Sequence, residues 1–217
     1  MTLAGPHGES DVTMSYLDLD RLAATPLARE PFDFVVVPGF VRAEQLTPIR
    51  ASYPEIQQPG SFDVSGLSYG EAFAAFLAEL GGPDFRRATE AKFDVDLTGR
   101  PSLVTVRGQC GERDGNIHTD SKSKIITVLI YLNEPWAPTG GRLRLLRSGR
   151  DLEDYALEVP PEGGLMLAFR RSRSSFHGHK LFIGPRKVVQ FNWVTGGGHV
   201  MWDLLRHRVS AWLKRAA

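Results

Sequence analysis

The sequence predicts a mainly β protein of the α+β class, with a layer of helices contributed by its N-terminal part. Three observations support this. Before Pro101, several segments have the apolar spacing of helices. After Pro101, short runs of β-type residues alternate with turns rich in Gly, Pro and Asn. The 217 residues show no linker or repeat, so we expect one domain over 1–217. Many short strands with such turns indicate a sandwich or a barrel.

The N-terminal elements are predicted from local patterns. Residues 1–14 are small and polar, and we expect a flexible terminus. Phe32–Val37 is expected to form a short strand that ends at Pro38-Gly39. Apolar residues three and four apart predict helices over 43–57, 68–80 and 83–92.

The C-terminal part contains the expected strands. The last stretch, Met201–Lys214, has the spacing of an amphipathic helix. Six runs ahead of it are rich in β-branched and aromatic residues: Leu103–Arg107, Lys124–Leu132, Arg142–Leu146, Leu165–Phe169, Ser174–Lys180 and Arg186–Val194.

Composition excludes several classes of partner. The formal net charge is +1, so no overall field favours nucleic acid or an anionic membrane. No apolar run reaches the length of a membrane span, and the first residues lack the pattern of a secretory signal. A single cysteine, Cys110, excludes an internal disulfide. We therefore expect a cytoplasmic protein.

A possible metal site begins with His118 and Asp120. Residues two apart on an extended segment point to the same face, so both side chains can reach one ion. With a distal histidine, His177, they can occupy one face of an octahedral metal, a ligand set that suits non-haem Fe(II). His179 lies on the same strand face, so spacing does not separate it from His177. The alternative is that the pair lies in a polar turn and His177 bonds to a backbone carbonyl.

Arg186 is the candidate for binding a carboxylate. Strand alternation puts it on one face with Val188, Gln190 and Asn192. If that face is buried, these polar groups need partners, and a dicarboxylate would supply one. The alternative is a solvent-exposed face, with Phe191 and its neighbours in the core.

The strand over Lys124–Leu132 offers further contacts to such a ligand. Thr127, Leu129 and Tyr131 share one of its faces. The Tyr131 hydroxyl could donate to the carboxylate that Arg186 holds. The alternative is a core tyrosine bonded to some other neighbour.

Taken in order, these motifs make the chain resemble the Fe(II)/2-oxoglutarate-dependent oxygenases, especially the prolyl-4-hydroxylase-like branch. The resemblance covers about Leu103–Val194, and Phe32–Phe40 resembles the family's opening strand. The order of the pieces is more specific than any one of them. The matching pieces are His118-Thr119-Asp120, Tyr131-Leu132-Asn133, Trp136, Gly140-Gly141, Gly163-Gly164 with the apolar run to Phe169, His177 and Arg186.

The resemblance implies a double-stranded β-helix, or jelly roll, as a catalytic core over 103–195. N-terminal helices would pack on one sheet, and a C-terminal helix would follow. It implies Fe(II), 2-oxoglutarate and O2 as cofactor and cosubstrates, with ascorbate as a possible reductant. It selects His177 over His179 because of the spacing to Arg186. The implied iron ligands are His118, Asp120 and His177; the implied cosubstrate contacts are Arg186, Tyr131, Thr127, Leu129, Gln190 and Asn192.

The activity implied by the family is hydroxylation of an unactivated C–H bond, with release of succinate and CO2. The substrate would be a prolyl residue or a small biosynthetic intermediate. Gly178 departs from the family pattern and changes the pocket rim. Two other classes remain open: a cupin-type metal enzyme that does not use 2-oxoglutarate, and a jelly-roll binding module without catalysis.

Polar loops beside the strands are candidate substrate contacts. Arg107–Asn116 and Trp136–Thr139 are the candidate gates over the pocket. Five arginines could attract an anionic substrate, although solvated surface charge is the simpler explanation for them. They are Arg107, Arg113, Arg170, Arg171 and Arg173.

Overall fold

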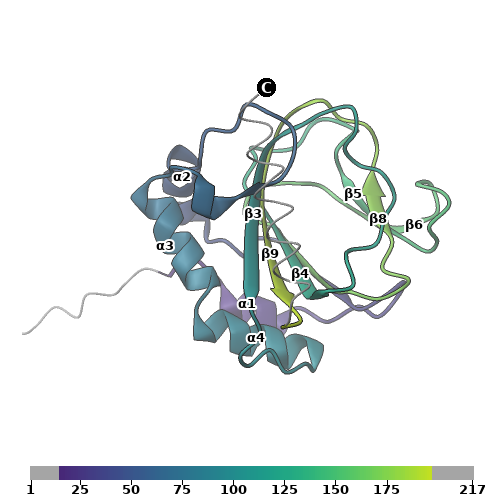
Figure 1. Ribbon diagram of the computed structural model, residues 1–217, viewed down its shortest axis with the longest axis horizontal. Coiled ribbons are helices and arrows are strands. Elements are labelled where there is room, and N and C mark those ends of the chain that lie inside the picture. The colour runs from purple at the N-terminus through teal and green to yellow at the C-terminus, as the bar shows by residue number, and fades with distance from the viewer. Residues whose placement is uncertain (1–14, 197–217) are drawn as a thin grey trace, which may run out of the picture.

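A computed structural model describes residues 15–196, and in it two antiparallel sheets face each other (Figure 1). The larger sheet has the strand order β1-β7-β4-β9-β3-β2, and the smaller sheet has the order β6-β5-β8. The described strands form a sandwich and no closed barrel, which decides between the two architectures that the turn pattern allowed. The expected C-terminal helix, Met201–Lys214, and the expected flexible terminus, 1–14, lie outside the described residues.

The strands of the larger sheet come from both halves of the chain. They are β1 (Phe34–Val37), β2 (Phe62–Asp63), β3 (Ser102–Cys110), β4 (Lys124–Tyr131), β7 (Met166–Arg170) and β9 (Gly184–Val194). The smaller sheet contains β5 (Leu143–Leu146), β6 (Tyr155–Val159) and β8 (His177–His179). All six strand runs expected after Pro101 are present, and β2 and β6 were not predicted. Both are short or half exposed, so their apolar alternation is weak.

Helices cover the outer face of the larger sheet, opposite the smaller sheet (Figure 1). Their order along the chain is α1 (Leu19–Ala24), α2 (Ala43–Ala51), the 3-10 turn η1 (Val64–Gly66), α3 (Glu71–Leu80) and α4 (Pro83–Phe93). The helix predicted over 43–57 was too long, because Pro54 disfavours a helical Tyr53. The Ser52 side chain also bonds back to the Pro48 carbonyl. Helix α1 was not predicted.

Strand alternation divides the apolar residues into two cores. One face of the larger sheet packs under the helices through residues such as Val128, Ile130 and Phe191. The other face packs toward the smaller sheet through residues such as Tyr131, Leu167 and Val188. Polar side chains on this second face therefore point into the space between the sheets, where the functional candidates lie. No helix within 15–196 is long and apolar enough to cross a membrane.

Candidate functional site

His118 and His177 are brought together by backbone pairing. An isolated antiparallel bridge joins them, and each backbone N–H donates to the other's carbonyl at 3.0 Å. Their rings lie side by side, with centroids 4.4 Å apart. The segment before His118 thus extends the smaller sheet beyond β8, which explains how two residues distant in sequence share one site.

Both histidines have one ring nitrogen fixed by the backbone. His118 Nδ1 donates to the Asn116 carbonyl at 2.8 Å, and His177 Nδ1 donates to the Ser175 carbonyl at 3.0 Å. Because a carbonyl can only accept, the proton sits on Nδ1 and the lone pair on Nε2 is free for a metal. Burial lowers the pKa of His177 to about 4, against the opposing charge of Asp120. The imidazole is therefore neutral at pH 7, as a ligand must be.

Asp120 is buried and held by two donors. The Lys124 ammonium lies 2.7 Å from Oδ1, and the Thr127 hydroxyl donates to Oδ2 at 2.5 Å. The Thr127 hydroxyl also lies 3.1 Å from the Asn192 side-chain amide. Burial raises the pKa of Asp120, but the Lys124 and His177 charges and these hydrogen bonds together lower it below its usual value. The carboxylate is thus ionised and oriented.

Together the three side chains form a cluster that could hold a metal ion. One ligand atom from each of His118, Asp120 and His177 lies within 4.8 Å of the others. This is the one group of this kind among residues 15–196, and His179 does not belong to it. Two neutral imidazoles and one carboxylate are the donor set that suits Fe(II) with open coordination positions, so the residues fit that metal.

Arg186 lies in the same cavity and is 5% exposed. Its Nε donates to the Gly141 carbonyl at 2.9 Å, and its guanidinium lies 5.3 Å from the centroid of the Tyr131 ring. The fully buried Tyr131 hydroxyl has no hydrogen-bond partner among the described residues. Burial raises the pKa of Tyr131, so the hydroxyl keeps its proton. A buried cation beside an unpaired donor fits a carboxylate ligand.

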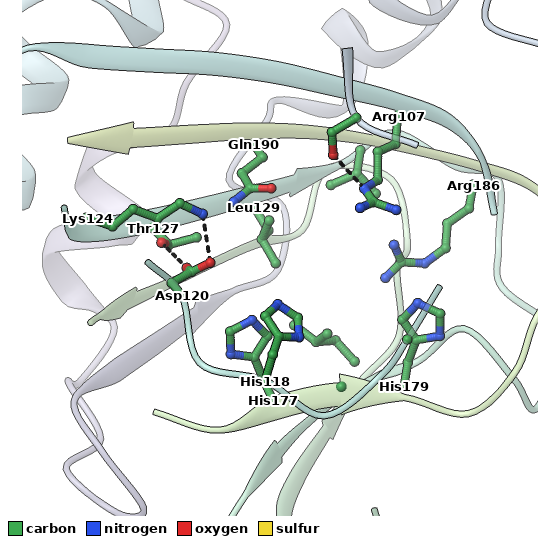
Figure 2. Close-up of a pocket in the computed structure, with 15 residues that line it drawn as sticks. Arg107, His118, Asp120, Lys124, Thr127, Leu129, His177, His179, Arg186 and Gln190 are labelled. Atoms are coloured by element: carbon green, nitrogen blue, oxygen red, sulfur yellow. Dashed lines mark hydrogen bonds and ion pairs between the residues drawn. The ribbon is translucent and has the colours of Figure 1, made fainter. Parts of the chain in front are cut away.

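The cavity between the sheets has a volume of about 250 Å³. Asp120 and the two paired histidines lie toward one end of it, and Arg186 and His179 toward the other (Figure 2). Of the other expected cosubstrate contacts, Thr127, Leu129 and Gln190 line this cavity. Asn192 is buried behind Thr127 and is not among the lining residues.

The unusual Gly178 has a steric reason. A Cβ on Gly178 would lie 2.8 Å from the Gly115 carbonyl oxygen, closer than Cβ contacts in proteins come. Gly115 itself has a φ of +93°, and a Cβ there would collide with the His179 carbonyl. The two glycines therefore allow the segment that carries His118 to approach β8 closely.

Two residues of the site, Lys124 and Ser61, were not assigned from the sequence. Lys124 forms an ion pair with Asp120, and the only sequence signal for this pair is that Lys124 lies four residues after Asp120. Arg107 lines the cavity together with Ser61, while Arg113, Arg170, Arg171 and Arg173 do not line it. Arg171 instead donates to the Asp120 backbone carbonyl at 3.2 Å.

Of the two candidate gates, the segment 107–116, which comprises the end of β3 and the loop after it, contributes residues to the cavity and 136–139 does not. Arg107 on β3 and Gly115 in the loop are both lining residues. The Trp136 ring of the second is buried, and its Nε1 donates to the Gly140 carbonyl. The first loop is therefore the one in position to contact a substrate.

Comparison with known proteins gives a family-model match over part of the chain, and a fold. Residues 108–195 match the model of the 2OG-Fe(II) oxygenase superfamily. A search of the curated proteins returns no match. Among solved structures, a Pseudomonas putida prolyl-4-hydroxylase is 19% identical, with a TM-score of 0.50 over 83% of this chain and 93% of that one.

Two further structures have the same fold. A viral collagen prolyl hydroxylase from Paramecium Bursaria Chlorella virus-1, solved as a 2OG complex, is 13% identical, with a TM-score of 0.52 over 75% of this chain and 96% of that one. A 2OG-Fe(II) oxygenase family protein from Burkholderia pseudomallei is 15% identical, with a TM-score of 0.52 over 82% and 90%. At such identities the likeness concerns the fold. The expected double-stranded β-helix is confirmed: the chain has the fold of the prolyl-4-hydroxylase-like structures, and its residues 108–195 match the 2OG-Fe(II) oxygenase superfamily model.

Proposed function

We propose that this protein is an Fe(II)- and 2-oxoglutarate-dependent dioxygenase that hydroxylates an unactivated C–H bond of a small molecule or a prolyl residue. One observation carries the proposal. The ligand atoms of His118, Asp120 and His177 lie within 4.8 Å of one another in a cavity that also contains a buried arginine, Arg186. A ligand triad and a carboxylate-binding group in one cavity are what such chemistry requires.

In this proposal the three residues would hold the iron, through the Nε2 of each histidine and one Asp120 oxygen. Bound Fe(II), with 2-oxoglutarate and O2, supplies oxidation that puts one oxygen atom into the substrate and the other into succinate, with loss of CO2. Ascorbate would serve as the reductant that keeps iron ferrous.

The cosubstrate would lie between the iron and Arg186. The terminal guanidinium nitrogens of Arg186 would bind its distal carboxylate, and the Tyr131 hydroxyl would donate to the same group. Leu129 and Gln190 would line its path. Thr127 is better placed to orient Asp120 than to touch the cosubstrate, with Asn192 supporting it from behind.

The test is turnover by the reconstituted protein. The enzyme is loaded with Fe(II) and 2-oxoglutarate without oxygen, and succinate is measured after oxygen is admitted. We expect slow succinate release alone, faster release with the primary substrate, and one atom of labelled O2 in the product. Turnover without 2-oxoglutarate would indicate a cupin-type enzyme, and binding without turnover would indicate a binding module.

A pair of variants tests the ligand assignment. His177→Ala should abolish Fe(II) binding and succinate release, because it removes one of three ligands. His179→Ala is the matched control, since it removes an imidazole from the same strand face and cavity but not from the cluster. It should retain Fe(II) binding and measurable activity. The reverse result would make His179 the distal ligand.

A further inference from the structure

A second cationic group, Arg107 on β3, is held rigidly at the cavity. Its Nε donates to Ser61 Oγ at 2.9 Å, and its Nη1 donates to Asp114 Oδ1 at 2.7 Å. The other Asp114 oxygen accepts the Gly111 N–H, which anchors the pair to the loop. Nη2 has no hydrogen-bond partner in the described part of the chain, and Figure 2 shows the guanidinium pointing into the cavity. A fixed fork with a free end is preorganised for an anion.

Ser61 provides a second donor at the same place. It lines the cavity, and its oxygen accepts from Arg107, so its own proton is free to point elsewhere. Arg107 Nη2 and the Ser61 hydroxyl thus offer two adjacent donors. Two donors match the two oxygens of a carboxylate, whereas a phosphate with three oxygens and nearly two charges requires more.

The charge balance of the cavity also favours an anion, and here the argument rests on the proposed function. The cavity is lined by three cations, Arg107, Lys124 and Arg186, and by one carboxylate, Asp120. Iron and Arg186 together balance Asp120 and the two carboxylates of 2-oxoglutarate. The positive charges of Lys124 and Arg107 are then not yet balanced, and Asp114 neutralises only one of these two charges. A substrate carboxylate would compensate the charge that is left.

The cavity is also small for a macromolecular substrate. Its volume of about 250 Å³ lies below the usual range of about 300–1,000 Å³ for small-molecule pockets. 2-Oxoglutarate must occupy part of it. An internal prolyl residue of a peptide would bring no carboxylate to Arg107, and its peptide groups cannot neutralise a cation.

We infer that the primary substrate is a small organic acid whose carboxylate binds Arg107 Nη2 and the Ser61 hydroxyl. Arg107 is then the residue that separates free acids from peptides. It is held in place by Asp114 and does not take part in binding 2-oxoglutarate.

Binding to the holoenzyme tests this assignment. Protein loaded with Fe(II) and 2-oxoglutarate under anaerobic conditions is titrated with a panel of small amino, hydroxy and aromatic acids and with the primary amide of each. An acetylated, amidated Gly-Pro-Gly peptide and phosphate monoesters complete the panel. We expect at least one acid to bind about tenfold or more tightly than its amide, because the amide loses a charge-assisted hydrogen bond.

Variants assign the preference to the site. Arg107→Gln should abolish the preference for acid over amide, and Ser61→Ala should reduce it while the Arg107–Asp114 pair stays intact. Arg113→Gln is the matched control, an exposed arginine in the loop after β3 that does not line the cavity. If Arg107→Gln only loosened the loop, the binding of acids and of amides would weaken alike. The ratio of the two affinities therefore separates a loss of carboxylate recognition from a loss of loop structure.

The outcomes are distinct. Equal binding of acids and amides overturns the inference, as does a preference for the peptide or the phosphates, an unchanged ratio in Arg107→Gln, or no acid bound by protein that binds 2-oxoglutarate. Failure of the iron-loaded protein to bind 2-oxoglutarate would instead contradict the proposed function. The 2-oxoglutarate titration is therefore run first on every variant.

Discussion

Replacing Arg186 by Ala should weaken 2-oxoglutarate binding by about two orders of magnitude or more. Arg186 is 5% exposed, so a carboxylate bound to it is poorly screened by water. Breaking a buried charge pair costs about 3–5 kcal/mol, and about 1.4 kcal/mol corresponds to one decade in affinity. Fe(II) binding should survive, because Arg186 is not in the ligand cluster.

The same change should also destabilise the fold. The Gly141 carbonyl would lose the donor that Arg186 Nε provides at 2.9 Å, which costs about 1–3 kcal/mol for a buried group. Arg186→Lys keeps the charge but loses the fork, so its affinity for 2-oxoglutarate should fall between those of the wild type and Arg186→Ala. The assay is calorimetric titration of 2-oxoglutarate into the anaerobic Fe(II)-loaded protein, with urea unfolding in parallel.

Tyr131→Phe is the sharpest control for this prediction. The hydroxyl is buried without a partner in the described part of the protein, so removing it should not lower the free energy of unfolding. If it donates to the bound carboxylate, its loss should weaken 2-oxoglutarate binding about tenfold to a hundredfold, because such a hydrogen bond to a charged group contributes about 1.5–3 kcal/mol. An unchanged 2-oxoglutarate dependence in Arg186→Ala would refute the reasoning, even if Tyr131→Phe behaved as expected.

Two other predictions concern the site's construction. Gly178→Ala should cost about 1–3 kcal/mol of stability and weaken Fe(II) binding, because its Cβ would displace the Gly115 carbonyl. Gly196→Ala, whose Cβ would have no atom of residues 15–196 within 4 Å, should be near neutral, and equal urea unfolding of both variants would contradict the steric argument. Separately, burial lowers the pKa of His177 and of His179 to about 4, below the usual 6.5. As the pH falls, these histidines therefore bind protons in the unfolded chain before they do in the folded one. The metal-free protein should be most stable above pH 6.5, and its free energy of unfolding should fall by about 3 kcal/mol per histidine between pH 6.5 and 4. Urea unfolding across that range is the measurement, and a flat profile would exclude buried neutral imidazoles.

The sequence by itself determined those features of the fold and of the site that depend on the spacing of residues within one helix or strand. Period-two alternation identified which residues of β4 and β9 share a face, and with them the candidates Tyr131 and Arg186, but it left open which face points inward. Helical spacing identified α3 and α4. The short His118–Asp120 spacing fixed that these two side chains share a face. Each of these depends on residues within one element, so neighbouring positions carry the information.

Only the tertiary structure decided which distant residues meet. Strand alternation left His177 and His179 equivalent and only the family resemblance favoured His177, whereas the bridge to His118 brings His177 into the cluster. The tertiary structure also shows that Arg107, one of five candidate arginines, lines the cavity and is held by Asp114. Pairing between strands distant in sequence is set by the packing of the whole sheet, and no local pattern encodes it.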